Sequence, residues 1–80
     1  MLRPKVVEVK PLDDYKLYVI FSTNEKKIFD VKPYFDIQFF HNLKDPTLFK
    51  TVKPEGLSIE WATGEDICPD ELYYNSVSAE

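Results

Sequence analysis

The chain has 80 residues and a mass of 9.4 kDa, so it forms one small domain at most. By area scaling, folding can bury about 63% of the unfolded surface, which excludes a large substrate cavity beside the core. The net charge of −4 disfavours broad nucleic-acid binding, because an acidic domain repels phosphate backbones. A single cysteine excludes an internal disulfide and fits a cytoplasmic location.

Aromatic and β-branched residues dominate the composition, with six Phe, five Tyr and one Trp, whereas alanine occurs only at Ala62 and Ala79. Such residues fit a pleated, half-buried surface, so we expect a β-rich domain and not a helical bundle. No signal peptide is expected after Met1. The longest uncharged runs have eight residues, whereas a membrane helix needs about twenty, so no membrane contact is expected.

The first part of the chain predicts three strands, Val6–Pro11, Tyr15–Ser22 and Lys27–Val31. In the first strand, alternation places Val7 and Val9 inward. The second strand has apolar residues on both faces, which predicts a central or covered position.

A hairpin turn is expected at Thr23-Asn24, because Asn tolerates left-handed dihedral angles. Pro33 fits the first turn of a short helical segment. Asp30 lies on an apolar strand, where a carboxylate must be exposed or hydrogen-bonded. We expect Asp30 to cap the Pro33 segment or to accept from nearby backbone N–H groups.

The second part of the chain predicts a short helix, with Asp45 as its N-cap and Pro46 at its first position. Two strands follow, Thr51–Pro54 and Ser58–Trp61, and in the second of them Leu57, Ile59 and Trp61 alternate with Ser58 and Glu60. Thr63-Gly64 predicts another hairpin turn, with Gly64 available for positive φ, followed by a brief return strand at Asp66-Ile67. Pro69 opens a last helix whose first turn is acidic.

Together these elements predict a single α+β domain over residues 1–80, with an ordered core of about residues 5–74 and a frayed tail over residues 75–80. Its small antiparallel sheet has about five short strands in two hairpins. Two or three short helices pack with that sheet. The strands pair antiparallel, since only the stretch between Val31 and Thr51 is long enough for a parallel crossover.

Three segments carry a recurring pattern. They are Leu17-x-Val19-x-Phe21 followed by Phe29-Asp30-Val31-x-Pro33, then Phe40-x-x-Leu43-x-Asp45-Pro46-x-x-Phe49, and Ile59-x-Trp61-x-x-Gly64-x-Asp66-Ile67-x-Pro69-x-x-Leu72-Tyr73. In order and spacing, these segments resemble the bacterial family called domain of unknown function 2442. The family usually has Asp-Gly at Thr23-Asn24 and Pro-Asn at Ala62-Thr63, and both substitutions are compatible with turns.

The resemblance implies a small α+β fold and no established activity. It assigns structural-motif positions to Asp30, Trp61, Gly64, Asp66, Pro69 and Leu72. Members of the family are often encoded beside another small uncharacterised protein, and some carry a helix-turn-helix domain. By association, the resemblance therefore implies a binding or regulatory module whose partner is the neighbouring gene product.

Catalytic chemistry has few candidate residues in this sequence. His41 is the sole histidine and Cys68 the sole thiol, and Cys68 precedes a helix N-terminus, which lowers a thiol pKa. One His and one Cys do not make a zinc site. Two glycines, Gly56 and Gly64, cannot form a phosphate-binding loop. The carboxylates of Asp66, Asp70 and Glu71 fit helix capping, so we expect no cofactor and no metal.

The aromatic residues are the most informative excess. The residues involved are Tyr34, Phe35, Phe39, Phe40, Tyr73 and Tyr74. Neighbouring residues on a strand or helix point in different directions, so one ring of Phe39-Phe40 and one of Tyr73-Tyr74 should face outward. These four residues are the expected interaction surface, and a homodimer of twofold symmetry would cover it. A tightly filled aromatic core is the other interpretation.

The sequence therefore predicts a cytoplasmic, non-catalytic protein–protein interaction or regulatory module. Its partner is a second copy of the chain or the neighbouring small gene product. The alternative is a small hydrolase or toxin-like enzyme that uses His41 with nearby carboxylates, and a third hypothesis is a nucleic-acid accessory protein. A concave pocket that contains His41 and a carboxylate would favour catalysis, whereas an exposed aromatic patch would favour binding.

Overall fold

The computed structural model describes residues 4–79, and over that range the chain forms two antiparallel sheets. The strands are β1 (Val6–Pro11), β2 (Lys16–Phe21), β3 (Lys26–Asp30), β4 (Lys53–Glu55), β5 (Ser58–Glu60), β6 (Asp66–Ile67) and β7 (Val77–Ser78). The helices are α1 (Pro46–Phe49), α2 (Pro69–Asn75) and the 3₁₀ helices η1 (Asp13–Tyr15), η2 (Lys32–Asp36) and η3 (Gln38–Lys44). The predicted α+β class and antiparallel pairing are confirmed.

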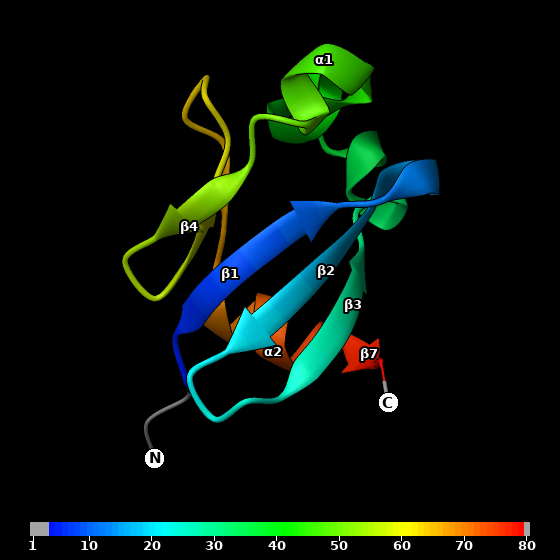
Figure 1. The fold of residues 1–80 in the computed structure, drawn as a ribbon. Helices are drawn as coiled ribbons and strands as arrows, with labels where there is room; N and C mark the ends of the chain where they lie inside the picture. Colours follow the sequence, from blue (N-terminus) through cyan, green and yellow to red (C-terminus); the bar gives the residue numbers. More distant parts are fainter. Residues whose placement is uncertain (1–3, 80) are drawn as a thin grey trace.

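The strands are divided between two sheets, where a single sheet was expected. Sheet A has the order β1-β2-β3-β7 and sheet B the order β4-β5-β6. Figure 1 shows β4 running beside β1 at the junction of the two sheets. The backbone N–H of Val6 donates to the carbonyl of Leu57 at 3.2 Å. Because β1 meets the β4–β5 hairpin near one end only, the ladder does not continue into a common sheet.

A β-bulge in β1 reverses the predicted inward face at its start. Val6 is opposite Phe21, and the register with β2 shifts between Val6 and Glu8. Val6 is therefore 3% exposed and Val7 50% exposed, although the alternation predicted Val7 to be inward. Val9 lies opposite Val19 and packs against the core as expected. A bulge adds one residue to a strand and so changes which face each preceding side chain occupies.

The β2–β3 hairpin follows its prediction closely. Leu17, Val19 and Phe21 are buried, while Tyr18 and Ile20 lie on the half-exposed face of the same central strand. Asn24 adopts a left-handed conformation with φ of 71°, and its N–H donates to the carbonyl of Phe21 at 2.8 Å. The turn thus relies on the tolerance of Asn for positive φ.

Short helical turns fill the stretch between the sheets. Pro33 lies at the start of η2, and the carboxylate of Asp30 accepts from the N–H of Lys32 at 3.0 Å. The carboxylate of Asp45 accepts from the N–H of Thr47 at 2.9 Å and caps α1. Both carboxylates therefore satisfy backbone donors at helix starts, as their positions predicted.

Sheet B buries a different set of side chains from the one its alternation predicts. Ile59 and Trp61 are buried as expected, but Leu57 is 47% exposed and Ser58 is buried. Leu57 belongs to the turn after Gly56 and precedes the first residue of β5, so it lies outside the strand's alternation. Ser58 is tolerated in the interior because its hydroxyl donates to the carbonyl of Ile67 at 2.6 Å.

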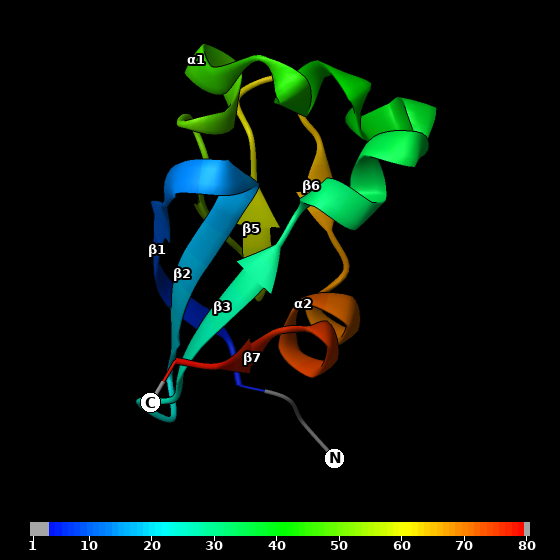
Figure 2. The ribbon, with the colours of Figure 1, turned by 90° about the vertical axis from the view of Figure 1, so that its right-hand side faces the viewer.

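The core lies between sheet A on one side and β5, β6 and α2 on the other (Figure 2). Its largest fully buried side chains are Trp61, Phe21, Phe29, Leu17, Leu43, Ile59 and Leu72. The Trp61 indole N–H donates to the carbonyl of Phe49 at 2.9 Å, which ties α1 to sheet B. One core thus joins both sheets.

The C-terminal segment forms the short strand β7 beside β3, within the span 75–80 for which a frayed tail is expected. Ile28 of β3 pairs with Val77 of β7, and the N–H of Ala79 donates to the carbonyl of Lys26 at 2.9 Å. The open edge of β3 offers unpaired backbone groups that the returning chain satisfies. Glu80 lies outside the described residues. Between residues 4 and 79 no helix has the length and apolarity needed to cross a bilayer.

Candidate functional site

The predicted interaction residues divide into two outward and two inward rings. Phe39 is 55% exposed and Tyr74 is 64% exposed. Phe40 is buried, and Tyr73 is partly buried against the core. One ring of each adjacent pair therefore faces solvent, and each outward ring stacks edge-to-face on its inward neighbour.

Tyr34 connects the Phe39–Phe40 ring pair to α2, the helix that carries Tyr74. Its ring lies 5.6 Å from that of Phe40, which in turn lies 4.9 Å from the ring of Phe39. Its hydroxyl donates to the carboxylate of Glu71 at 2.7 Å and accepts from the side-chain amide of Asn75 at 3.2 Å. Burial and the Glu71 hydrogen bond raise the pKa of Tyr34.

Helical spacing brings Tyr74 to the same face of α2 as these polar partners. Residues 71, 74 and 75 are separated by three and four positions, which align on one face of a helix. Figure 2 shows η2, η3 and α2 on the same side of the molecule, away from the outer face of sheet A. We call Tyr34, Ile37, Phe39 and Tyr74 the aromatic surface; Ile37, Phe39 and Tyr74 are exposed, and Tyr34 is partly buried.

Tyr73, which was expected in the interaction surface, is partly buried and packs against the core. Its hydroxyl lies 2.9 Å from both carboxylate oxygens of Glu25. The ammonium of Lys27 lies 4.0 Å from the centre of the Tyr73 ring and donates to the Tyr73 carbonyl at 3.1 Å. Hydrogen bonds from Thr23 and then Tyr73 lower the pKa of Glu25, while the same carboxylate raises the pKa of Tyr73. This network fastens α2 to the β2–β3 hairpin.

The structure keeps the two candidate catalytic residues on separate elements. His41 is exposed on η3, and Cys68 is exposed at the residue before α2. Within residues 4–79, no hydrogen bond or ion pair joins His41 to Cys68 or to a carboxylate. Over the same range, no group of three or more His, Cys, Asp or Glu residues could hold a metal ion.

The family-pattern residues hold the fold together. Trp61 and Leu72 are buried in the core, and Pro69 is the first residue of α2. Gly64 has φ of 97°, which an L side chain rarely adopts. Asp66 is exposed on β6 at the edge of sheet B. Apart from the exposed Asp66, these positions, like Asp30, are explained by caps, turns and packing.

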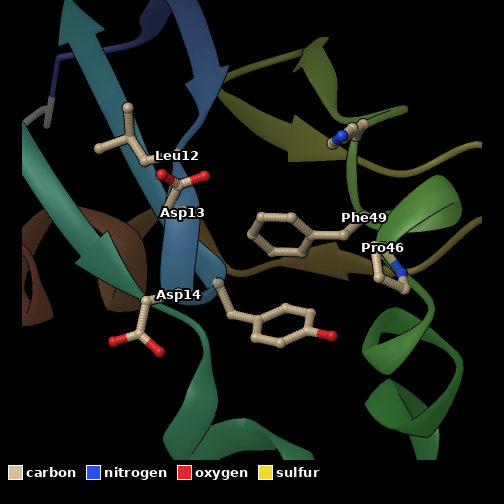
Figure 3. Close-up of a pocket in the computed structure, with 7 residues that line it drawn as sticks. Leu12, Asp13, Asp14, Pro46 and Phe49 are labelled. Atoms are coloured by element: carbon tan, nitrogen blue, oxygen red, sulfur yellow. The ribbon is translucent and has the colours of Figure 1, made fainter.

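A pocket of about 240 Å³ lies between η1 and α1, at a place that the sequence did not single out. Its lining residues are Leu12, Asp13, Asp14, Tyr15, Pro46, Phe49 and Lys50. In Figure 3 the ring of Phe49 extends from α1 toward Asp13, whereas the carboxylate of Asp14 points away. His41 is not among the lining residues, so the pocket does not combine histidine with carboxylates.

Two consecutive residues of the pocket have left-handed backbone conformations. Asp14 has φ of 63° and Tyr15 has φ of 58°. For residues other than glycine, such conformations cost on the order of 1–3 kcal/mol each and persist where surrounding contacts hold them. The ammonium of Lys32 donates to the carboxylate of Asp14 at 2.9 Å and to its carbonyl at 2.8 Å. This partner lowers the pKa of Asp14, and the pKa of Lys32 is raised in turn.

The Tyr15 side chain is also held from several directions. Its ring lies edge-on to Phe35 at 5.0 Å and to Phe49 at 5.2 Å. Its hydroxyl donates to the carbonyl of Lys44, and its own carbonyl accepts from the N–H of Val31. The aromatic wall of the pocket is therefore formed by Tyr15 and Phe49, which are 34 positions apart in the chain.

Comparison with known proteins identifies one relationship. A family model with the description "Protein of unknown function (DUF2442)" matches residues 6–78. Searches of curated proteins and of solved structures returned no match. The matched span contains both sheets, the aromatic surface and the pocket, and its description assigns no activity to any of them.

Proposed function

The chain belongs to the DUF2442 family of proteins of unknown function, as its three motifs predicted, and on that premise we propose that it is a non-catalytic protein-binding or regulatory module. It presents the aromatic surface to a protein partner in the cytoplasm. The observation that carries this proposal is the exposure of Phe39 and Tyr74 in a domain whose other rings pack inward or lie partly buried.

Exposed aromatic rings are typical of binding surfaces because they bury a large area with few rotatable bonds. Phe40 packs beneath Phe39 and Tyr73 beside Tyr74, so both outward rings are already held in place before a partner arrives. A preorganised surface loses less conformational entropy on binding. These rings are therefore expected to contribute most of the binding energy of the interface.

Two partners fit the proposal. A second copy of the chain could cover the aromatic surface through twofold symmetry, since one patch then serves both subunits. The neighbouring small gene product that the family resemblance implies is the other partner. The net charge of −4 favours a partner whose facing surface is basic.

Sedimentation equilibrium from micromolar to millimolar concentration, alone and with the co-expressed neighbouring product, tests the proposal. Phe39→Ala and Tyr74→Ala should each weaken association about tenfold or more, because truncating an interface ring costs upward of about 1–2 kcal/mol. Val7→Ala is the matched control, since Val7 is equally exposed but lies on β1. A chain that stays monomeric and binds no neighbouring product, or variants that behave like the control, would refute the proposal.

A double variant, His41→Ala with Cys68→Ala, tests the enzymatic alternative in the same system. Both side chains are exposed, so the variant should fold, bind the partner with unchanged affinity and keep any cellular phenotype. Loss of the phenotype in a folded double variant that still binds would favour the hydrolase.

A further inference from the structure

We propose that the pocket between η1 and α1 binds the guanidinium group of an arginine side chain that a protein partner presents. The proposal rests on the protein-binding function only in that a protein supplies the arginine. The pocket is built from the β1–β2 connection and α1, whereas the aromatic surface lies on η2, η3 and α2. The two sites can therefore be tested separately.

The size of the pocket limits its occupant to a single side chain. Its volume is about 240 Å³, whereas pockets that enclose drug-sized molecules and cofactors measure roughly 300–1,000 Å³. Apolar groups of Leu12 and Pro46 line part of it, beside the rings of Tyr15 and Phe49. An occupant with an aliphatic stem and a compact polar head matches this lining.

Charge and aromatic faces indicate that the polar head is a cation. The carboxylate of Asp13 has no hydrogen bond or ion pair within residues 4–79, whereas that of Asp14 is paired with Lys32. Asp13 thus offers a free carboxylate among the residues that line the pocket. A cation placed there would pair with the carboxylate of Asp13 and contact the partly buried ring of Tyr15, since Phe49 is only 3% exposed.

Arginine fits this combination better than lysine. Its guanidinium is planar and weakly hydrated, stacks on aromatic rings and donates two parallel hydrogen bonds to one carboxylate. A lysine ammonium is strongly hydrated and lacks a face that can stack. The net charge of −4 would also draw a cationic segment toward the domain before contact.

Lys50 opposes the proposed ligand and so provides a sensitive test. It lines the pocket and is exposed, and it forms no ion pair among the described residues. An anion bound at Lys50 would meet the unpaired carboxylate of Asp13, which lines the same pocket. Removing the charge of Lys50 should therefore increase the affinity for a cationic ligand and decrease the affinity for an anionic one.

The experiment is a titration of the folded, isotope-labelled chain followed through its backbone amide NMR signals. The probe is the blocked tripeptide acetyl-Gly-Arg-Gly-amide, and its citrulline analogue is the uncharged control of almost the same shape. The arginine peptide should shift the backbone amide signals of residues 12–15 and 47–50 in a saturable way. The citrulline peptide should bind about three- to fivefold more weakly, because it lacks the charge that pairs with Asp13.

Charge-neutralising variants complete the test. Asp13→Asn should lower the affinity for the arginine peptide about three- to fivefold, and Lys50→Gln should raise it about twofold, as expected of partly exposed charge interactions. Asp66→Asn makes the same charge change on sheet B and should leave binding unchanged. Equal binding of the citrulline peptide, an Asp13→Asn effect no larger than that of Asp66→Asn, or weaker binding in Lys50→Gln would overturn the proposal. None of these measurements depends on Phe39 or Tyr74. The arginine pocket can therefore be confirmed even if binding through the aromatic surface is refuted.

Discussion

Trp61 offers the sharpest test of the core, because it combines complete burial with one directed hydrogen bond. Its side chain is 1% exposed, packs near Phe49 and donates from its indole nitrogen to the Phe49 carbonyl at 2.9 Å. Two substitutions separate these contributions. Trp61→Ala removes the whole ring, whereas Trp61→Phe keeps an aromatic ring and removes only the donor and part of the volume.

The expected losses follow from burial and hydrogen bonding. Truncating a buried tryptophan to alanine costs about 3–5 kcal/mol. Trp61→Phe leaves the buried Phe49 carbonyl without its donor, which costs about 1–3 kcal/mol. A domain of this length has only about 4–12 kcal/mol of unfolding free energy, taking roughly 0.05–0.15 kcal/mol per residue. The alanine variant should therefore lie close to the limit of folding.

Urea titration followed by circular dichroism gives the two free energies of unfolding, and thermal melts give a second estimate. At roughly 4–8 °C per kcal/mol, Trp61→Ala should lower Tm by at least about 12 °C and Trp61→Phe by at least about 4 °C. Phe39→Ala is the control, since it removes a large but exposed ring. A Trp61→Ala protein that melts within two degrees of the parent would show that the inward face of sheet B is assigned wrongly.

Three further predictions follow from the backbone and the charged network. Because the bulge buries Val6 and exposes Val7, Val6→Ala should cost about 1.5–3 kcal/mol and Val7→Ala less than about 0.5 kcal/mol; equal losses in urea titrations would contradict the bulge. Gly64→Ala places a side chain at φ of 97° and should cost about 1–2 kcal/mol, so an unchanged Tm would mean that the turn adapts. The pKa of Glu25 is lowered in the folded chain from its ordinary value of 4.5. Its stabilising contribution is therefore present above that pH and is lost as the pH falls through the lowered pKa. Glu25→Gln should flatten this part of the acid unfolding curve, and an unaltered curve would exclude the network as its source.

The parts of the fold that depend on neighbouring residues could be predicted from the sequence. The apolar alternation in β2, the positive φ of Asn24 and the cap by Asp45 all act over a few positions. The bulge in β1 could not be predicted in this way, because it arises from the register against β2. The two-residue strand β7 has no periodicity of its own and exists because β3 has an open edge.

The candidate sites, too, are partly predictable from neighbouring residues and partly set by long-range contacts. Local geometry required that one ring of Phe39-Phe40 face outward, but the contact between Phe40 and Tyr34 decides which ring is buried. The pocket depends on two residues in left-handed conformations, Asp14 and Tyr15. Neither is a glycine, and they belong to no recognisable turn motif, so the sequence does not indicate this geometry. Long-range contacts with Lys32 and Lys44 stabilise that geometry, and no spacing in the sequence indicates them.

The pairing of β7 with β3 has a consequence for synthesis of the chain on the ribosome. Ile28 and its partner Val77 are 49 positions apart, so at about 5–20 residues per second β7 emerges roughly 2–10 s after β3. A hairpin such as β2–β3 forms in about 1–10 μs, and its outer edge is therefore bare for most of translation. The two lysines on that edge, Lys26 and Lys27, carry charge on the strand that would otherwise pair with another nascent chain. Replacing Lys26, whose side chain is outside the Lys27–Tyr73 contact, should increase aggregation during expression and leave the free energy of unfolding nearly unchanged.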